Sequence, residues 1–157
     1  MRLSCGCSSS YPTNLIALHP HGAHPLGEDY SMAKIVLVVD DHEIVRKMVC
    51  SMFIAQGFEV YYAENGAQAV DKAQELHPHL VVLDLAMPVM DGLEAARKLK
   101  MLMPSLPLLM FTNNVGAILE QEARAAGIAA VISKSGSAEL LVKAKALLSG
   151  VKGAGVG

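Results

Sequence analysis

Short apolar runs recur along the chain, and each one ends at a polar residue. They lie at residues 35–39, 80–83, 106–111 and 128–133. Continuous apolar runs of this length are typical of strands in a parallel sheet that is covered on both faces. A further strand is indicated at residues 58–63, where the side chains alternate in character.

Segments with helical periodicity separate these strands. The first of them carries an apolar stripe at Ile44, Val45, Met48, Val49, Met52 and Phe53. The expected helices span residues 43–56, 67–76, 93–102, 115–126 and 137–148. Strands that alternate with helices in this way predict an α/β fold with a doubly wound parallel sheet.

The residues that directly follow the apolar strands carry the candidate chemistry. They are Asp40, Asp41, Asp84, Thr112 and Lys134. Because open α/β sheets bind ligands at the carboxyl ends of their strands, we expect these side chains to converge at one edge of the sheet. Each of them alone has a simpler interpretation, since strand-end aspartates often cap the helix that follows. As a set, they indicate a functional site.

The residue types in this set favour phosphoryl chemistry. Carboxylates held close together raise one another's pKa, so such a cluster needs a compensating cation. Their hard oxygen atoms suit Mg²⁺, which commonly shares a phosphate with one or two carboxylates. The amine of Lys134 and the hydroxyl of Thr112 are suited to contact phosphoryl oxygens. A carboxylate is itself a nucleophile that forms an aspartyl phosphate without a general base.

Composition narrows the class of protein. The 157 residues carry a net charge of −2 without a long basic run, so we expect no direct binding to nucleic acid. No apolar stretch approaches the roughly 20 residues that a membrane helix requires. The three cysteines do not form a disulfide framework, which favours a reducing compartment and a cytoplasmic protein.

The first 31 residues differ from the rest of the chain. They are rich in Ser, Gly, Pro and His and lack periodicity, so we expect a disordered leader, with translation beginning at Met32; the intact mass of the native protein tests this. Residues 150–157 are expected to form a flexible tail. A zinc site is conceivable from Cys5, Cys7, His19, His21 and His24. Their spacing matches no compact zinc module, and the disordered leader is the favoured interpretation.

Four segments resemble the receiver domain of bacterial two-component response regulators. They are residues 38–42 (VVDDH), 83–92 (LDLAMPVMDG), 111–112 (FT) and 133–134 (SK). The resemblance covers residues 33–149. It implies a five-stranded parallel sheet of order 2-1-3-4-5, the flavodoxin-like or CheY-like fold. It also implies a stand-alone signalling protein that is not an enzyme.

The resemblance assigns roles to the strand-end residues. Asp84 resembles the aspartate that accepts a phosphoryl group from a histidine kinase. Asp41 resembles the direct Mg²⁺ ligand, while Asp40 holds a metal-bound water or part of the coordination sphere. Asp84 itself and the backbone carbonyl of Ala86 complete the protein ligands of Mg²⁺.

The remaining roles concern switching, and here the chain departs from the family pattern. Thr112 resembles the hydroxyl that moves toward the phosphoryl group, and Lys134 the amine that pairs with it. Val131 replaces the usual Tyr or Phe, so we expect no ring-based relay. Ser135 replaces the common proline. We expect Asn113, in place of a small residue, to slow hydrolysis, which the phosphoryl lifetime of Asn113→Ala would test.

The implied partners are a sensor histidine kinase or phosphotransfer protein and an unknown downstream protein. The fourth helix, with Glu120, Glu122 and Arg124, is most simply a solvated face, although in this family it often belongs to the partner-binding surface. His42 is interpreted as a partly exposed first-turn residue.

Three other functions remain open from the residues. An aspartyl phosphatase of the haloacid dehalogenase type would need an Asp-x-Asp pair and a longer chain. A flavodoxin-like cofactor binder would need a phosphate loop, and two aspartates would repel the cofactor's phosphate. A receiver-shaped interaction module that is never phosphorylated is the main alternative to the switch.

Overall fold

The computed structural model describes residues 33–150 of the chain. The expected leader, its candidate zinc ligands and all but the first residue of the expected tail lie outside the described residues. The predictions about them therefore stay predictions.

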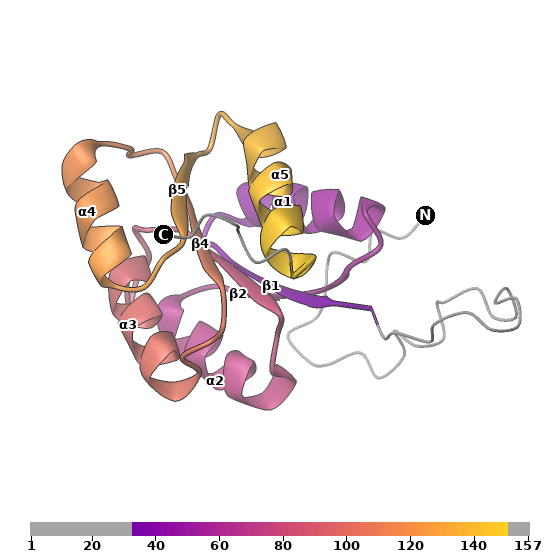
Figure 1. Ribbon diagram of the computed structural model, residues 1–157, viewed down its shortest axis with the longest axis horizontal. Helices are drawn as coiled ribbons and strands as arrows, with labels where there is room; N and C mark the ends of the chain where they lie inside the picture. Colours follow the sequence, from indigo (N-terminus) through magenta and orange to yellow (C-terminus); the bar gives the residue numbers. More distant parts are fainter. Residues whose placement is uncertain (1–32, 151–157) are drawn as a thin grey trace, which may run out of the picture.

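Five parallel strands form one sheet between two layers of helices (Figure 1). The strands are β1 (Ile35–Val39), β2 (Glu59–Ala63), β3 (Leu80–Leu83), β4 (Leu108–Thr112) and β5 (Ala130–Ser133). The helices are α1 (Glu43–Ala55), α2 (Gly66–Leu76), α3 (Gly92–Leu102), α4 (Ala117–Ala125) and α5 (Ser137–Leu148). The order β2-β1-β3-β4-β5 confirms the predicted doubly wound topology.

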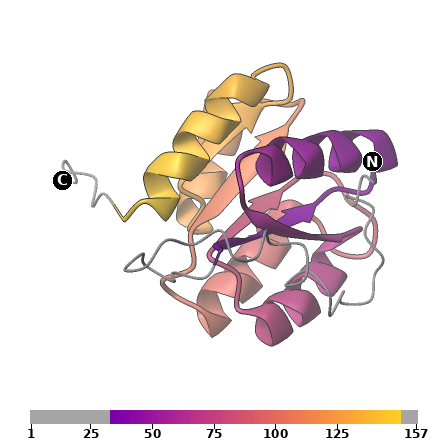
Figure 2. The same ribbon diagram turned by 90° about the vertical axis from the view of Figure 1, so that its right-hand side faces the viewer.

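Each face of the sheet has its own apolar core. Helices α1 and α5 lie side by side over one face (Figure 2). There Val49, Phe53 and Leu140 are buried against β1, β3 and β4. Helices α2, α3 and α4 cover the other face, largely with alanines such as Ala95 and Ala96. Because both faces are covered, the strands consist of continuous apolar residues.

Three element boundaries differ from the sequence prediction by two residues, and the others agree within one residue. Helix α4 begins at Ala117, two residues late, because Gly116 is its extended N-cap. Strand β4 begins after Pro107, which has no N–H to donate to a neighbouring strand. Strand β5 begins at Ala130 because the N–H of Ile128 still donates to the carbonyl of Ala123 in α4.

The buried face of α1 also differs from the predicted apolar stripe. Ile44 is 80% exposed and Met48 is 42% exposed, although both belong to that stripe. The buried residues of α1 are Arg46, Val49, Cys50 and Phe53. The helix is therefore rotated so that a charged residue, Arg46, lies on its inner side.

The strand register brings the candidate residues to one edge of the sheet. Val39 lies opposite Leu83 in β3, and Thr112 lies opposite Ser133 in β5. The backbone continues these pairings beyond the strands, since the N–H of Asp84 donates to the Val39 carbonyl at 2.9 Å. Consequently the residues that follow β1, β3 and β5 emerge at the same level.

Within residues 33–150, no helix is long and apolar enough to cross a membrane.

The opposite end of β1 supports a prediction about pH. Nδ1 of His79 accepts a hydrogen bond from the N–H of Ile35 at 2.9 Å. Partial burial and the charge of Lys34 lower the pKa of His79, while Glu59 opposes them. The imidazole of His79 thus binds a proton more weakly in the folded protein than in the unfolded chain. The stability that neutral His79 contributes is complete above the unfolded pKa of 6.5, and it is lost as the pH falls from there through the lower folded-state pKa.

We expect the urea midpoint of the wild type to fall more than that of His79→Gln when the pH is lowered from about 7.5 to about 5.5. His77→Asn is the control, because His77 is an exposed neighbour in a left-handed conformation that asparagine tolerates. Identical pH dependence in the wild type and His79→Gln would contradict the assignment.

Candidate functional site

Two buried carboxylates and one amine form the centre of the site. Nζ of Lys134 lies 2.8 Å from Oδ2 of Asp40 and 3.2 Å from Oδ2 of Asp84. The two aspartates are 3% and 6% exposed, respectively. Residues from the ends of β1, β3 and β5 thus meet in one cluster, as the strand pattern predicts.

Backbone N–H groups orient both aspartates. Oδ1 of Asp40 accepts a hydrogen bond from the N–H of His42, and Oδ1 of Asp84 accepts one from the N–H of Leu85, each at 2.8 Å. Each carboxylate therefore has one oxygen bound by its own loop and the other bound by Lys134. His42 itself is exposed, as expected, but it is the N-cap residue that precedes the first turn of α1.

A third carboxylate adjoins this pair. Asp41 is exposed, and one carboxylate oxygen from each of Asp40, Asp41 and Asp84 lies within 4.8 Å of the others. Three hard oxygen donors, one of them open to solvent, fit a cation such as Mg²⁺ that keeps several water ligands. Ala86, whose carbonyl is the predicted fourth ligand, is exposed in the β3–α3 loop; its role stays a prediction.

Burial and charge set the protonation of the cluster. Burial raises the pKa of Asp84, the nearby Asp40 raises it further, and Lys134 only partly opposes them. Burial by itself lowers the pKa of Lys134, but its hydrogen bonds and ion pairs with Asp40 and Asp84 outweigh burial and raise it. The amine therefore stays charged, while the site retains excess negative charge that a cation would relieve.

Thr112, for which a switching role is predicted, lies at the same edge but outside the ion-pair cluster. Thr112 is buried, and its hydroxyl oxygen accepts a hydrogen bond from the N–H of Asn114 at 3.3 Å. Asn113 is exposed beside it. In place of the family's proline, Ser135 donates its N–H to the hydroxyl of Ser133 at 3.2 Å. The serine thus forms a local turn directly after the cluster.

The loop after Asp84 depends on one glycine. A Cβ atom on Gly92 would overlap with the carbonyl oxygen of Asp84. The N–H of Gly92 donates to the carbonyl of Leu85 at 2.8 Å, which folds the loop back onto the end of β3. Val89, at the tip of this loop, has a positive φ of 71° and is 81% exposed. Gly92 is the last residue of the LDLAMPVMDG segment, and only the structure shows what a side chain there would strike.

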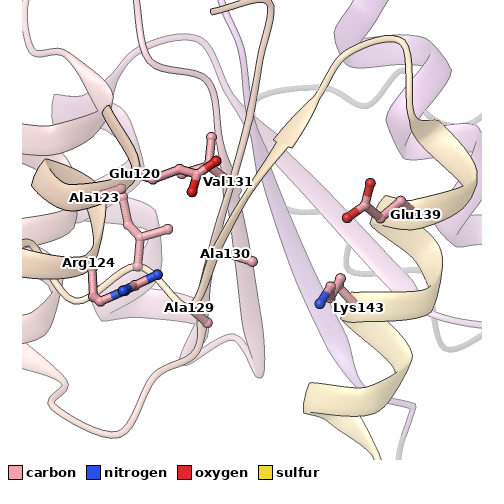
Figure 3. Close-up of a pocket in the computed structure, with 9 residues that line it drawn as sticks. Glu120, Ala123, Arg124, Ala129, Ala130, Val131, Glu139 and Lys143 are labelled. Atoms are coloured by element: carbon pink, nitrogen blue, oxygen red, sulfur yellow. The ribbon is translucent and has the colours of Figure 1, made fainter. Parts of the chain in front are cut away.

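A groove lies between α4, the outer edge of β5 and α5 (Figure 3). Its volume is about 250 Å³, and its lining residues are Glu120, Ala123, Arg124, Ile128, Ala129, Ala130, Val131, Glu139 and Lys143. Glu120 and Glu139 lie toward one end of the groove, and Arg124 and Lys143 lie toward the other. Glu120 precedes Arg124 by four residues on α4, and Glu139 precedes Lys143 by four residues on α5. Both helices therefore present their acidic residue one turn before their basic residue.

Arg46 is a contact of the site that was not predicted from the sequence. Its Nη1 donates to the backbone carbonyl of Asp40 at 2.9 Å. The available signal was its spacing, because Arg46 precedes Val49 and Phe53 by three and seven residues and so shares their helix face.

Comparison with known proteins shows which proteins this chain resembles. The family model described as the response regulator receiver domain matches residues 36–146. The chemotaxis protein CheY of Bacillus subtilis is 47% identical over 70 residues, which are 44% of this chain and 58% of that protein. The transcriptional regulatory protein LnrK of the same organism is 34% identical over 111 residues, covering 69% of this chain and 50% of that protein.

A solved structure shows the same fold. The chemotaxis protein CheY4 of Vibrio cholerae superposes with a TM-score of 0.71 at 31% identity, covering 74% of this chain and all of that one. The chain spans only about half the length of the two Bacillus relatives. The likeness therefore concerns the receiver part and not the whole activity of those proteins.

The close approach at Gly92 generates a prediction. In Gly92→Ala the new methyl group forces the β3–α3 loop away from the Asp84 carbonyl, and we expect a loss of roughly 1–3 kcal/mol in the free energy of unfolding. Gly116→Ala is the control, because a Cβ at that position meets nothing within 4 Å. Urea denaturation of both variants checks this; equal stability of the two would contradict the predicted overlap.

Proposed function

The chain belongs to the response regulator receiver domain family, and from this premise we propose that Asp84 accepts a phosphoryl group from the phosphohistidine of a histidine kinase or phosphotransfer protein. The observation that carries the proposal is the pairing of Asp84 with Lys134 beside two further carboxylates. A buried carboxylate can act as the nucleophile in phosphoryl transfer, and a charged amine beside it can stabilise the transferred phosphoryl group. The protein acts in two-component signalling.

The proposed transfer uses Asp84 as the nucleophile. An oxygen of its carboxylate forms a bond to phosphorus while the bond from phosphorus to the histidine nitrogen breaks, and the departing imidazole takes up a proton from water. Lys134, already hydrogen-bonded to Asp84, pairs with a phosphoryl oxygen. Thr112 turns its hydroxyl from the Asn114 N–H toward another phosphoryl oxygen.

Mg²⁺ is the proposed cofactor. The carboxylates of Asp40, Asp41 and Asp84, with the carbonyl of Ala86, hold it; the clustering of three carboxylate oxygens supports this choice. When bound, the ion neutralises negative charge on the carboxylates and the phosphoryl group. Asp41, which resembles the direct Mg²⁺ ligand of the family, is the exposed member of the set.

The groove between α4, β5 and α5 is the proposed docking surface for the downstream protein. Val131 lines it at the position where the family usually has an aromatic ring, so the groove is left open. Because its acidic and basic residues lie toward opposite ends, it favours a partner segment with the reverse order of charges.

Phosphorylation by a small donor is the primary test. Incubation with Mg²⁺ and acetyl phosphate or phosphoramidate is expected to add one phosphoryl group to the wild type, measured by intact mass. Asp84→Ala is expected to show no adduct, and neither is the wild type with EDTA in place of Mg²⁺. The acidic Asp71, on the exposed side of α2, gives a matched control, since Asp71→Ala should be modified like the wild type.

Absence of an adduct with these donors and with a panel of phosphorylated histidine kinases would contradict the proposal. It would favour the alternative, a receiver-shaped interaction module that does not use phosphorylation.

The output surface has its own test. Under steady-state phosphorylation, we expect the backbone amide resonances of Glu120 and Val131 to shift in the wild type but not in Asp84→Ala. Resonances of α2, which lies on the far side of α3 from the groove, should stay in place. Shifts confined to the loops around Asp84 would mean that the groove does not sense phosphorylation.

A further inference from the structure

Arg46 is a buried cation that the proposed phosphoryl transfer does not use. It is only 7% exposed, and the other buried polar residues of the described chain are Asp40, Asp84 and Thr112, all at the site. Burying a guanidinium group is costly unless its charge and its N–H groups are paired. Its contacts should therefore show what it holds in place.

Three groups hold the guanidinium of Arg46. Nη1 donates to the Asp40 carbonyl at 2.9 Å, and Nη2 lies 3.4 Å from Oε1 of Glu64. Its Cζ lies 4.6 Å from the centroid of the Tyr62 ring, within the range of a cation–π interaction. Tyr62 lies near the end of β2 and Glu64 directly follows that strand, so Arg46 links α1, the end of β2 and the β1–α1 loop.

The carbonyl that Arg46 binds belongs to the peptide bond between the two acids of the site. A peptide group is planar, so fixing the oxygen of Asp40 also fixes the N–H and Cα of Asp41. The other polar groups of Asp40 are bound as well, its N–H to the carbonyl of Ala63 at 3.2 Å and its Oδ1 to the N–H of His42. Asp41, which is exposed, receives its orientation through this backbone.

We propose that Arg46 is a positioning residue for the metal site: by holding the Asp40–Asp41 peptide group, it presets the Asp41 carboxylate toward Asp40 and Asp84. Tyr62 and Glu64 in turn hold Arg46. The inference rests on the proposed Mg²⁺ site. It adds that the end of β2, which contributes no ligand, determines how tightly the metal binds.

The action is through hydrogen bonding, not through the field of the charge at the nucleophile. The groups that shift the pKa of Asp84, besides burial and the Leu85 N–H, are Asp40 and Lys134. Lys47 is the main cause of the lowered pKa of Glu43 on the outer side of α1, and the charge of Arg46 adds a smaller contribution there. A lysine at position 46 keeps the positive charge but lacks the planar guanidinium with its several N–H donors. We therefore expect Arg46→Lys to retain the Mg²⁺ affinity only in part.

The test is titration of the protein with Mg²⁺ alone, followed by calorimetry. We expect Arg46→Met to weaken Mg²⁺ binding about tenfold, within the range seen for groups that orient metal ligands, and Arg46→Lys to fall between Met and the wild type. Val49→Ala is the matched control. It lies one turn along the same buried face and should lower the stability to urea while leaving the Mg²⁺ affinity within about twofold of the wild type.

The outcomes separate the two proposals. Failure of the folded wild type to bind Mg²⁺ would remove the metal site and, with it, the role of Arg46. Normal binding by the wild type and equal affinity in Arg46→Met and Val49→Ala would overturn the role of Arg46 alone. If Arg46→Met does not fold, Glu64→Gln and Tyr62→Leu each remove one contact of the Arg46 guanidinium. Unchanged Mg²⁺ affinity in both of these variants would overturn the proposal.

Discussion

The burial of two carboxylates side by side is the constraint on which the rest of the site depends. Asp40 and Asp84 are almost inaccessible to solvent, and their mutual repulsion has one nearby compensating amine, that of Lys134. Such a cluster persists only if its members are held by a rigid frame. The parallel register of β1, β3 and β5 supplies that frame, because it ends all three strands at the same level.

This arrangement leaves the site with more negative than positive charge, on which the proposed phosphorylation depends. Burial and the neighbouring Asp40 raise the pKa of Asp84. One amine cannot neutralise three clustered carboxylates, so a cation is favoured nearby. A phosphoryl group would compete for the same amine and for the hydroxyl of Thr112. The β4–α4 loop, which binds that hydroxyl through the Asn114 N–H, leads directly to α4 and its groove. The proposed output is therefore connected to the site through a loop and not through an aromatic ring.

The fold and the centre of the site could be predicted from the sequence because both depend on local patterns. Apolar runs of four to six residues, separated by helical segments, specify a covered parallel sheet. Once the strands are parallel, their final residues must share an edge, so Asp40, Asp84 and Lys134 were expected to meet. The motif around Asp84 also pointed to the family that the receiver domain match confirms.

Tertiary structure decided what depends on neighbours far away in the chain. The six apolar residues of the predicted stripe gave the buried face of α1 only in part, because a stripe shows that a helix is amphipathic but not how far it is rotated. Ile44 is exposed, whereas Arg46 is buried. Arg46 is buried because it contacts Tyr62, Glu64 and the Asp40 carbonyl, which lie outside its own helix. Periodicity records which residues prefer burial. Only the packing of the elements determines which of these residues are buried, and which polar residue is buried together with its partners.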